Sequence, residues 1–537
     1  MSTNNPAPYP TGQRALSARE QLQRAQALSC VNGAQQAKCQ GQVHLALFFD
    51  GTGNNINLDY YQAPAGKQKP SNIARLFLAA RDKPQDGYFA SYMPGVGTPF
   101  PEIGDTGGLA GLAGGQGGEA RILWALTRLL NAPHRYATGG ALLLDDGMAK
   151  NVCDTASGGF GGVVRKLIMR NWQQKLQAAL KGRKPEVTQI NLSVFGFSRG
   201  ATEARAFVNW LYQLCKEENG GWTFAGIPLR TQFLGIFDTV ASVGNAQALP
   251  GRLPFTGHMA WADGNLAIHP AVEQCVHFVA GHEVRACFPL DSVRHGNAYP
   301  GNALEVMYPG SHSDVGGGYA AGELGVSLAQ DSQMCVIPGR RMYDAARQAG
   351  VPLRTWDQLT DNVQKLLTPS PQAIKDFNAY LRDAKVAPGP VEKMHEQHMA
   401  LYLSHRFKYR RTFSQHQPYR TANATDKAGL KATQDSLLKS LGRLYAGDPM
   451  AADFDPQRAA VRKDQNYGRV LLPAEGGTRE TTPRIVAAQL DLRRLTPAIE
   501  HFLENYIHDS MAGFMGGAEA YLNSGLLKFR TVFKGEE

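Results

Sequence analysis

A serine between two glycines carries the strongest chemical signal in this sequence. Ser198 is the central residue of Gly-Phe-Ser-Arg-Gly at 196–200, and an apolar, β-branched run that begins at Val187 leads into it. A helix-forming segment follows directly. A turn this tight leaves no room for side chains around the serine, and Gly196 and Gly200 meet that requirement. The pattern therefore predicts a nucleophile at the apex of the turn, and the alternative is a strand-to-helix turn without chemistry.

A serine hydroxyl becomes a good nucleophile only when a histidine takes its proton and an acid orients that histidine. In an α/β-hydrolase these partners follow the serine along the chain, first Asp or Glu and then His, on loops after later strands. Asp238 follows an apolar run at 231–237, and His312 follows another at 303–308. Parallel strands end at one sheet edge, so we expect Ser198, Asp238 and His312 to form a catalytic triad.

Each partner of the serine has a structural alternative. Asp238 is also a suitable cap for the following turn, and His312 is suitable for bonds to local backbone. Asp291 and His295 form a rival pair, but no clear strand directly precedes them. Asp314 is only two residues from His312 and is badly placed to be its acid, so we expect Asp314 to fix the loop or bind its backbone amides.

The charge that develops on a substrate oxygen needs backbone N–H donors. The amide of Arg199 is one candidate, because Arg199 directly follows the nucleophile. The first apolar strand ends in Asp-Gly-Thr-Gly-Asn-Asn, where Gly51 and Thr52 are candidates for the second donor and Asp50 would orient the loop. The alternatives are a glycine-rich turn without a ligand and a phosphate-binding loop, which the missing Lys-Ser/Thr disfavours.

The side chain of Arg199 has a simpler interpretation. Glu203 lies four residues further along the expected helix, at the spacing of an intrahelical ion pair. We therefore expect Arg199 and Glu203 to pair with each other.

Strands and helices alternate through the part of the chain that carries these residues. Apolar runs predict buried strands at 43–49, 187–195, 231–237, 275–280 and 303–308. Helical patterns are found at 118–131, 160–181 and 202–215. This alternation is typical of βαβ crossovers. We expect an α/β-hydrolase-like fold, a mostly parallel sheet flanked by helices, followed by a mainly helical C-terminal accessory region.

The length of the chain, 537 residues, predicts more than one structural unit. We expect a polar leader at 1–40, a catalytic core at 41–325 and the accessory region at 326–537. Residues 107–118 are so rich in glycine that we expect a mobile loop rather than a stable helix there, and this loop is a lid candidate.

Two segments of the accessory region are further candidates for contact with lipid. Residues 400–420 are basic and aromatic, and residues 514–529 are largely apolar. Packing in a protein core explains both segments as well.

The net charge, the cysteines and the apolar runs limit the kinds of partner and cofactor that we expect. A net charge of +10 suits an anionic partner such as a phospholipid surface, although a basic solvated surface explains it equally. The seven cysteines show no zinc spacing, so we expect reduced thiols and no metal or cofactor, with a Cys30–Cys39 bridge as the alternative. The sequence shows no secretory signal and no apolar run long enough to cross a bilayer.

Four separated segments resemble, in sequence and in order, the first family of type VI secretion lipase effectors. They are FFDGTGNN, GFSRGATEARAF, GIFDTVASVG and PGSHSDVGGGY. The likeness extends over about residues 43–320 and leaves 325–537 without a comparable match.

The resemblance implies a phospholipase that cleaves ester bonds of glycerophospholipids at the A1 or A2 position without a metal. Carried onto this sequence, its triad is Ser198, Asp238 and His312. The resemblance also implies secretion from the cytoplasm by a contractile apparatus, docking on its spike protein, and action on membrane phospholipids in the periplasm of a neighbouring bacterium. A periplasmic immunity protein would protect the producing cell.

Two other functions are compatible with the same residues. The triad would equally serve a soluble ester, thioester or peptide, because specificity lies in the pocket and lid. A hydrolase fold without activity would instead act as a binding module through its basic face. We do not expect nucleic acid as the partner, since no recognition motif is visible.

Overall fold

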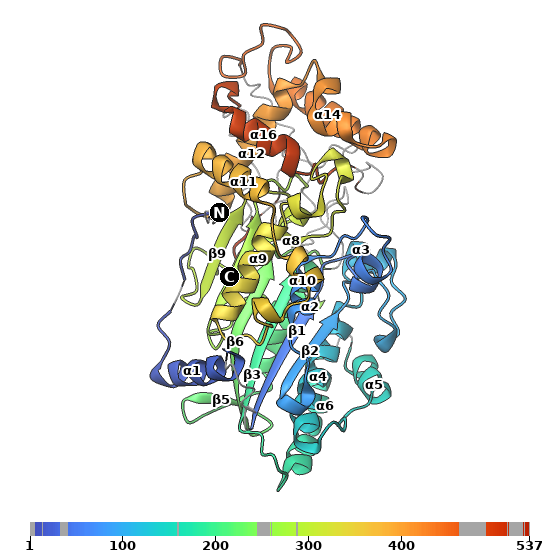
Figure 1. Cartoon of the computed structure of the whole chain (residues 1–537), viewed down its shortest axis with the longest axis vertical. Helices are drawn as coiled ribbons and strands as arrows, with labels where there is room; N and C mark the ends of the chain where they lie inside the picture. The colour runs from blue at the N-terminus through green and yellow to red at the C-terminus, as the bar shows by residue number, and fades with distance from the viewer. Residues whose placement is uncertain are drawn as a thin grey trace.

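The computed structural model describes residues 6–12, 14–32, 41–157, 161–243, 258, 260–285, 288–460, 490–512, 514, 530 and 532–535. A twisted sheet occupies the centre of the molecule, and a group of helices lies beyond one end of it (Figure 1). Within the described residues no helix is both long and apolar enough to span a bilayer.

The main sheet has eight strands in the described part of the chain. Its parallel strands lie in the order β2 (Tyr88–Met93), β1 (Gln42–Phe49), β3 (Gln189–Phe197), β6 (Ile227–Phe237), β7 (Cys275–Ala280) and β9 (Ala303–Tyr308). Antiparallel strands β4 (Lys216–Glu218) and β5 (Gly221–Phe224) extend the sheet beside the first residues of β6. Separately, β8 (Leu290–Asp291) pairs in parallel with β10 (Val532–Phe533).

Both faces of the sheet are covered, which explains why its strands are apolar almost throughout. Successive side chains of a strand point to opposite faces. In β1, Leu45 and Leu47 belong to one buried cluster, whereas Ala46 and Phe48 belong to the other. The sequence prediction of a mostly parallel sheet flanked by helices is confirmed.

One face of the sheet is covered by α4 (Gly118–Thr138) and α7 (Arg199–Tyr212), and α5 (Asp146–Ala156) and α6 (Gly161–Leu180) pack against α4. Of these four helices, the sequence pattern predicted α4, α6 and α7 but not α5. The opposite face packs against α2 (Asn72–Ala79) and α9 (Val336–Gln348), and α10 (Asp361–Leu366) packs against α2. Helix α9 therefore covers the sheet, although it belongs to the region 326–537 that the sequence analysis assigned to the accessory part. The boundary between core and accessory region at residue 325 stays a prediction.

Beyond the carboxyl edge of the sheet the chain is mainly helical, as expected (Figure 1). The helices are α11 (Pro371–Ala384), α12 (Val391–Lys408), α13 (Gln417–Thr421), α14 (Ala424–Leu444) and α16 (Pro497–Tyr506). Apolar side chains of α11, α12, α14 and α16 belong to the same buried cluster as those of α9. In the basic and aromatic segment 400–420, Leu403, Arg406 and Phe407 are buried, which favours core packing over contact with lipid. Residues 515–529 of the second lipid candidate lie outside the described residues.

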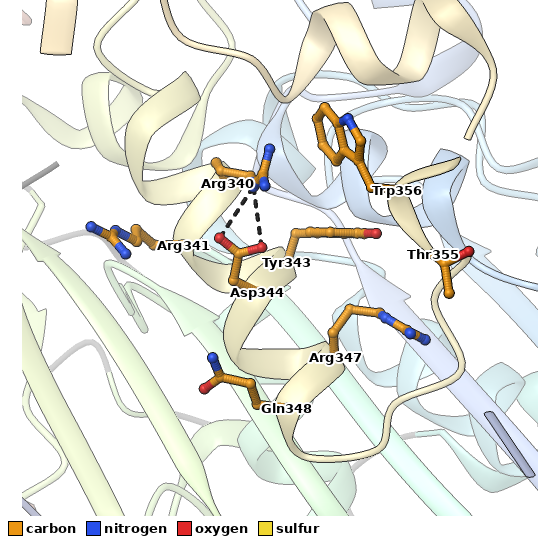
Figure 2. Close-up of a pocket in the computed structure, with 8 residues that line it drawn as sticks. All are labelled: Arg340, Arg341, Tyr343, Asp344, Arg347, Gln348, Thr355 and Trp356. Carbon is orange, nitrogen blue, oxygen red and sulfur yellow. Dashed lines mark hydrogen bonds and ion pairs between the residues drawn. The ribbon is translucent and has the colours of Figure 1, made fainter. Parts of the chain in front are cut away.

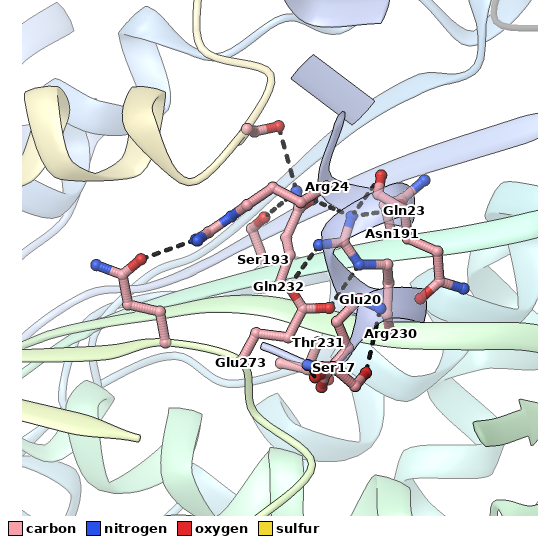
Figure 3. A network of polar contacts seen from close by, with 12 residues as sticks. Ser17, Glu20, Gln23, Arg24, Asn191, Ser193, Arg230, Thr231, Gln232 and Glu273 are labelled. Atoms are coloured by element: carbon pink, nitrogen blue, oxygen red, sulfur yellow. Dashed lines mark hydrogen bonds and ion pairs between the residues drawn. The ribbon is translucent and has the colours of Figure 1, made fainter. Parts of the chain in front are cut away.

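The N-terminal helix α1 (Ala18–Asn32) lies at the amino edge of the sheet, near the start of β6. Figure 3 shows a buried ion pair there, in which the guanidinium of Arg230 donates to both carboxylate oxygens of Glu273. Gln23 of α1 donates to the side chain of Gln189 in β3 at 3.0 Å. This contact, and the bond from Arg230 to the carbonyl of Gln23 at 3.3 Å, attach α1 to the edge of the sheet opposite to the predicted site.

Helix α9 carries an arginine-rich hollow of about 340 Å³ on its outer side (Figure 2). The guanidinium carbon of Arg340 lies 4.0 Å from the ring centre of Trp356, and Arg340 also pairs with Asp344 at 3.1 Å. None of the residues that the sequence predicts for the active site lines this hollow.

Two expectations about local structure are wrong. Residues 107–118 do not form a loop throughout, because Leu109–Gly114 is the helix α3. The side chain of Arg199 donates to carbonyls of Gly111 and Leu112, which offsets the low helix propensity of glycine. The expectation of reduced thiols fails at Cys30, which is disulfide-bonded; Cys39, its proposed partner, lies outside the described residues.

Gly200→Ala tests the close approach of α7 to the end of β1. An added Cβ would lie 2.3 Å from the carbonyl oxygen of Asp50 and 2.4 Å from that of Phe49, and neither backbone atom can move freely. We expect the free energy of unfolding, measured in urea, to fall by about 2 kcal/mol.

Gly442→Ala is the matched control. This glycine lies exposed in α14, and a Cβ there would meet no heavy atom within 4 Å. We expect a neutral or slightly stabilising effect of up to ~1 kcal/mol. Equal stability of the two variants would contradict the packing described here.

Candidate active site

The turn between β3 and α7 holds Ser198 in a conformation that few residues other than glycine adopt. Its φ is 57° and its ψ is −126°. An added Cβ on Gly196 would approach the carbonyl oxygen of Gly200 to 2.4 Å. The strained apex and the two crowded glycines agree with the geometry of a nucleophile elbow.

The hydroxyl of Ser198 is not used to stabilise the helix that follows. Ser198 occupies the N-cap position of α7, yet its side chain makes no capping hydrogen bond. The residue is buried, and its backbone bonds to the neighbouring strand end: its N–H donates to Phe237 at 3.0 Å, and its carbonyl accepts from Val240 at 3.3 Å. The elbow is thus fixed against the loop that begins at Asp238.

Asp238 and His312 lie together at the carboxyl edge of the sheet. Asp238 directly follows β6, and His312 is the first residue of α8 (His312–Gly316), which follows β9. The Nδ1 atom of His312 is 2.5 Å from Oδ2 of Asp238. Both side chains are almost fully buried. The structure therefore brings this predicted pair together across 74 residues of sequence.

The ring of His312 is held between two phenylalanines. Its centre is 4.6 Å from that of Phe197 and 5.0 Å from that of Phe288. The backbone N–H of His312 donates to the buried carboxylate of Glu283 at 3.1 Å. Burial lowers the pKa of His312, although the bond with Asp238 acts in the opposite direction. A neutral imidazole can accept a proton, which is the property a general base requires.

Sequence reasoning missed Arg530, which binds the same carboxylate. Its Nη1 and Nη2 atoms donate to the two oxygens of Asp238 at 2.8 and 2.9 Å. Burial alone would raise the pKa of Asp238, but the charge of Arg530 and the bond with His312 hold that pKa well below its usual range. No motif surrounds Arg530, so the sequence offers no signal for this contact.

The rival residues have other partners. Asp291 lies 2.5 Å from the Nε2 atom of His258 and does not pair with His295. Asp314 accepts from the backbone N–H and hydroxyl of Ser311, and its other oxygen is 2.5 Å from Nδ1 of His508. Asp314 thus fixes the histidine loop and ties it to the end of α16.

Asp50 orders the proposed oxyanion loop, as the sequence suggested. The same contacts, however, occupy the N–H of one of the two candidate donors, Gly51. One oxygen of Asp50 accepts from the backbone N–H of Gly51 at 2.7 Å, and the other accepts from the hydroxyl of Tyr92 at 2.5 Å. Burial raises the pKa of Asp50 to about 7. Because its N–H is already bonded, Gly51 is not free to donate to a substrate oxygen, and Thr52 is left as the candidate from this loop.

The expected ion pair between Arg199 and Glu203 is absent. The guanidinium of Arg199 instead reaches across to Thr52, whose hydroxyl oxygen accepts from Nε at 2.7 Å, and to the carbonyls of α3. Both carboxylate oxygens of Glu203 are buried without a hydrogen-bond partner. Burial, opposed by the charges of Arg121 and Arg199, raises the pKa of Glu203 to about 8.

No group of three or more His, Cys, Asp or Glu side chains in the described residues is arranged to hold a metal ion.

Comparison with known proteins identifies the family. The family model for the catalytic domain of Tle1-like phospholipase effectors of the type VI secretion system (T6SS) matches residues 44–222 and 213–344. The chain belongs to this family. The match contains the Ser198 elbow, Asp238 and His312, and it agrees with the resemblance seen in the sequence motifs.

Two solved structures are similar to this chain. An uncharacterized protein from Pseudomonas aeruginosa has a TM-score of 0.71 at 24% identity, over 93% of this chain and 81% of that one. That likeness supports the fold. The Tle1 effector bound to the VgrG spike from the T6SS has a TM-score of 0.34 at 17% identity, over 67% of this chain and 83% of that one. No curated protein sequence matches the chain.

The buried carboxyl of Glu203 makes the stability of the protein depend on pH. The unfolded chain ionises Glu203 near its ordinary pKa of 4.5, whereas the folded chain does so only near 8. The folded state therefore loses stability relative to the unfolded state as the pH rises through this interval. Glu203→Gln removes the loss, and at pH 8 we expect a gain on the order of 3 kcal/mol in the free energy of unfolding.

Unfolding in urea at several pH values measures this effect. The advantage of Glu203→Gln should vanish near pH 4.5 and grow toward pH 8. Glu217→Gln, at an exposed position of β4, is the matched control. A difference between parent and Glu203→Gln that stays constant with pH would contradict the assignment.

Proposed function

We propose that the protein is a serine-dependent phospholipase that hydrolyses carboxylic ester bonds of glycerophospholipids. The observation that supports this most strongly is the buried Asp238–His312 pair, which lies at the sheet edge where the Ser198 elbow also lies. Membership of a phospholipase effector family supports the class of substrate.

The residues suggest the following order of events. The Nε2 atom of His312 takes the proton of the Ser198 hydroxyl while its oxygen attacks the ester carbonyl. Asp238 accepts from Nδ1 of His312 and stabilises the imidazolium that forms. The proton then passes to the leaving lysophospholipid oxygen, and an acyl-enzyme remains. Water, activated by His312, releases the fatty acid and restores Ser198.

The negative charge on the carbonyl oxygen requires N–H donors. We propose the backbone amide of Arg199, which is the first of helix α7, and that of Thr52. The first amides of a helix have no acceptor within the helix and carry the positive end of its dipole. The bond between the side chains of Arg199 and Thr52 holds the two donors in one unit.

Helix α3 is the lid that we propose. It has two leucines with exposed side chains, Leu109 and Leu112, and Leu109 is 81% exposed. Its carbonyls are bonded to Arg199, the residue after the nucleophile. Displacement of α3 would therefore release Arg199 at the place where substrate must enter. A bilayer offers the exposed leucines an apolar environment that water does not.

The family also suggests the setting in which the enzyme acts. We propose delivery by a type VI secretion apparatus to the periplasm of a target bacterium, with membrane phospholipids as substrate. The family is named after Tle1, a solved structure shows the Tle1 effector bound to the VgrG spike, and we propose a spike protein as the carrier of this chain. A periplasmic immunity protein is the partner that would protect the producer.

Ser198→Ala tests the nucleophile. The rate of fatty acid release from defined phospholipid vesicles should fall by roughly 10³-fold or more, because attack at the carbonyl is lost. Mass analysis of the lysophospholipid made by the parent distinguishes A1 from A2 cleavage.

The parent and Ser198→Ala together also distinguish the phospholipase from the two alternative functions, an esterase for a soluble substrate and a binding module. Faster Ser198-dependent hydrolysis of a short-chain soluble ester than of vesicles would indicate a soluble substrate. Equal effects of parent and Ser198→Ala on vesicles and on a bacterium that expresses them in its periplasm would contradict the catalytic proposal and leave a binding module.

Leu109→Glu tests the lid. We expect slower hydrolysis of vesicles and an unchanged rate on a monomeric short-chain ester, since only the approach to the bilayer is impaired. Leu22→Glu is the matched control, because Leu22 is also exposed but lies on α1 at the opposite edge of the sheet. Equal effects of both variants on vesicle hydrolysis would show that α3 has no special part in it.

A further inference from the structure

Arg530 is the only arginine in the described residues that is bonded to a group of the proposed triad. Its side chain and that of Asp238 are both fully buried, with none of either surface exposed to solvent. The two hydrogen bonds join each nitrogen to a different carboxylate oxygen. A guanidinium that binds both oxygens fixes the plane of the carboxylate as well as its charge.

The carboxylate of Asp238 makes contacts on both oxygens. Its Oδ1 accepts from Nη1 of Arg530 and from the backbone N–H of Ala280, at 2.8 and 2.9 Å. Its Oδ2 accepts from Nη2 of Arg530 and contacts Nδ1 of His312. Arg530 thus provides half of the bonds that orient the acid. Without it, a buried carboxylate would keep its charge with only one charged or titratable partner, His312.

A short strand brings Arg530 to this position. Two residues later, β10 pairs with β8, with Val532 beside Leu290 and Phe533 beside Asp291. The carbonyl of Phe533 also accepts from Ser292 at 3.1 Å. The pairing thus holds the chain two residues after Arg530 against the strand that begins two residues after Phe288.

Arg530 also contacts the loop that holds the base. Its Nε donates to the carbonyl of Phe288 at 2.8 Å, and the ring of Phe288 packs edge-on against His312. One side chain thus bonds to the acid and to a residue that supports the histidine. A change at Arg530 would move both members of the pair relative to Ser198.

We propose that Arg530 is a positioning residue for ester hydrolysis, and that the β10–β8 pairing completes the catalytic site by placing it. The proposal rests on the triad mechanism given above. Among the described residues no hydrogen bond joins Arg530 to Ser198, and we propose that it acts through Asp238. It keeps the carboxylate ionised and in the plane in which Nδ1 of His312 can donate to it.

The charge of Arg530 also sets the basicity of His312 through Asp238. Loss of a positive charge from the carboxylate leaves more of its negative charge to favour the imidazolium, so the pKa of His312 should rise. The other charged or titratable groups around this pair are Glu283, Arg285 and His395. They are unchanged in an Arg530 variant.

Arg530→Ala is the first variant to measure. We expect kcat for ester hydrolysis to fall by roughly 10²-fold through misplacement of the pair. KM should change by less than about twofold, since no bond to substrate is removed. The acid limb of the kcat profile should move to higher pH. Guanidinium ion, added at a concentration that does not unfold the protein, should restore part of the lost rate.

Two further variants control for folding and for charge. Arg530→Lys keeps the charge but cannot bind both oxygens, so we expect an intermediate kcat, a smaller pH shift and no gain from guanidinium. It also provides the measurement if Arg530→Ala fails to fold. Lys534→Ala removes a cation four residues away in the same segment and should leave kcat and its pH profile unchanged.

A fluorophosphonate probe reacts with an activated serine whatever the natural substrate is. The rate at which it labels Ser198 therefore distinguishes failure of the positioning role of Arg530 from failure of the proposed phospholipase function. If the parent is labelled but does not hydrolyse phospholipid, the substrate proposal fails, and Arg530 is tested by the labelling rate. If Ser198 of the parent is not labelled, the triad itself fails. Arg530 variants with parental kcat or labelling rate, or with a loss that neither shifts the pH profile nor responds to guanidinium, would overturn the positioning role.

Discussion

The site depends on burial of one negative charge, that of Asp238. A carboxylate removed from water is stable only when donors replace the water around it. Here the donors come from three separate parts of the chain, namely Ala280 at the end of β7, His312 after β9, and Arg530. Each of these segments must be in place before the charge is satisfied. The contacts that hold these segments together at the sheet edge are therefore the same contacts that keep Asp238 ionised beside His312.

A second constraint acts on the nucleophile, and it is steric. The elbow requires Gly196 and Gly200 to have no side chains, because backbone atoms lie where their Cβ atoms would be. The turn brings the start of α7 against the end of β1, so the end of that strand, the proposed oxyanion loop and the proposed nucleophile pack closely together. Ser198 is strained, and the surrounding backbone holds it there.

The sequence was sufficient for features that follow from local rules. Strand ends, small residues around a serine and the order of acid and base along the chain led to Ser198, Asp238 and His312, and apolar runs led to the parallel sheet. The triad assignment itself stays a proposal. Features set by distant contacts could not be predicted. Arg530 lies 292 residues from Asp238, and β10 is two residues long, too short for a periodic signal.

Two local predictions were wrong because contacts with distant parts of the chain outweighed local preferences. Glycine content argued against a helix at α3, but bonds from Arg199 hold its carbonyls. The spacing of Arg199 and Glu203 favoured an ion pair in an isolated helix. In the folded protein Arg199 binds other segments, and the carboxylate of Glu203 is left without a hydrogen-bond partner. A spacing rule cannot detect that competition, because it considers only one helix.

The position of Arg530 in the chain has a consequence for biosynthesis. A ribosome makes the elbow, the acid and the base before it makes Arg530, since that residue is C-terminal to all of them. A nascent chain can thus assemble the sheet and its core while the carboxylate of Asp238 still lacks its main counter-charge. If membrane phospholipid is the substrate, as proposed, it also surrounds the cell that makes the protein, and this order of translation delays completion of the proposed site until helices α11 to α16 have been synthesised.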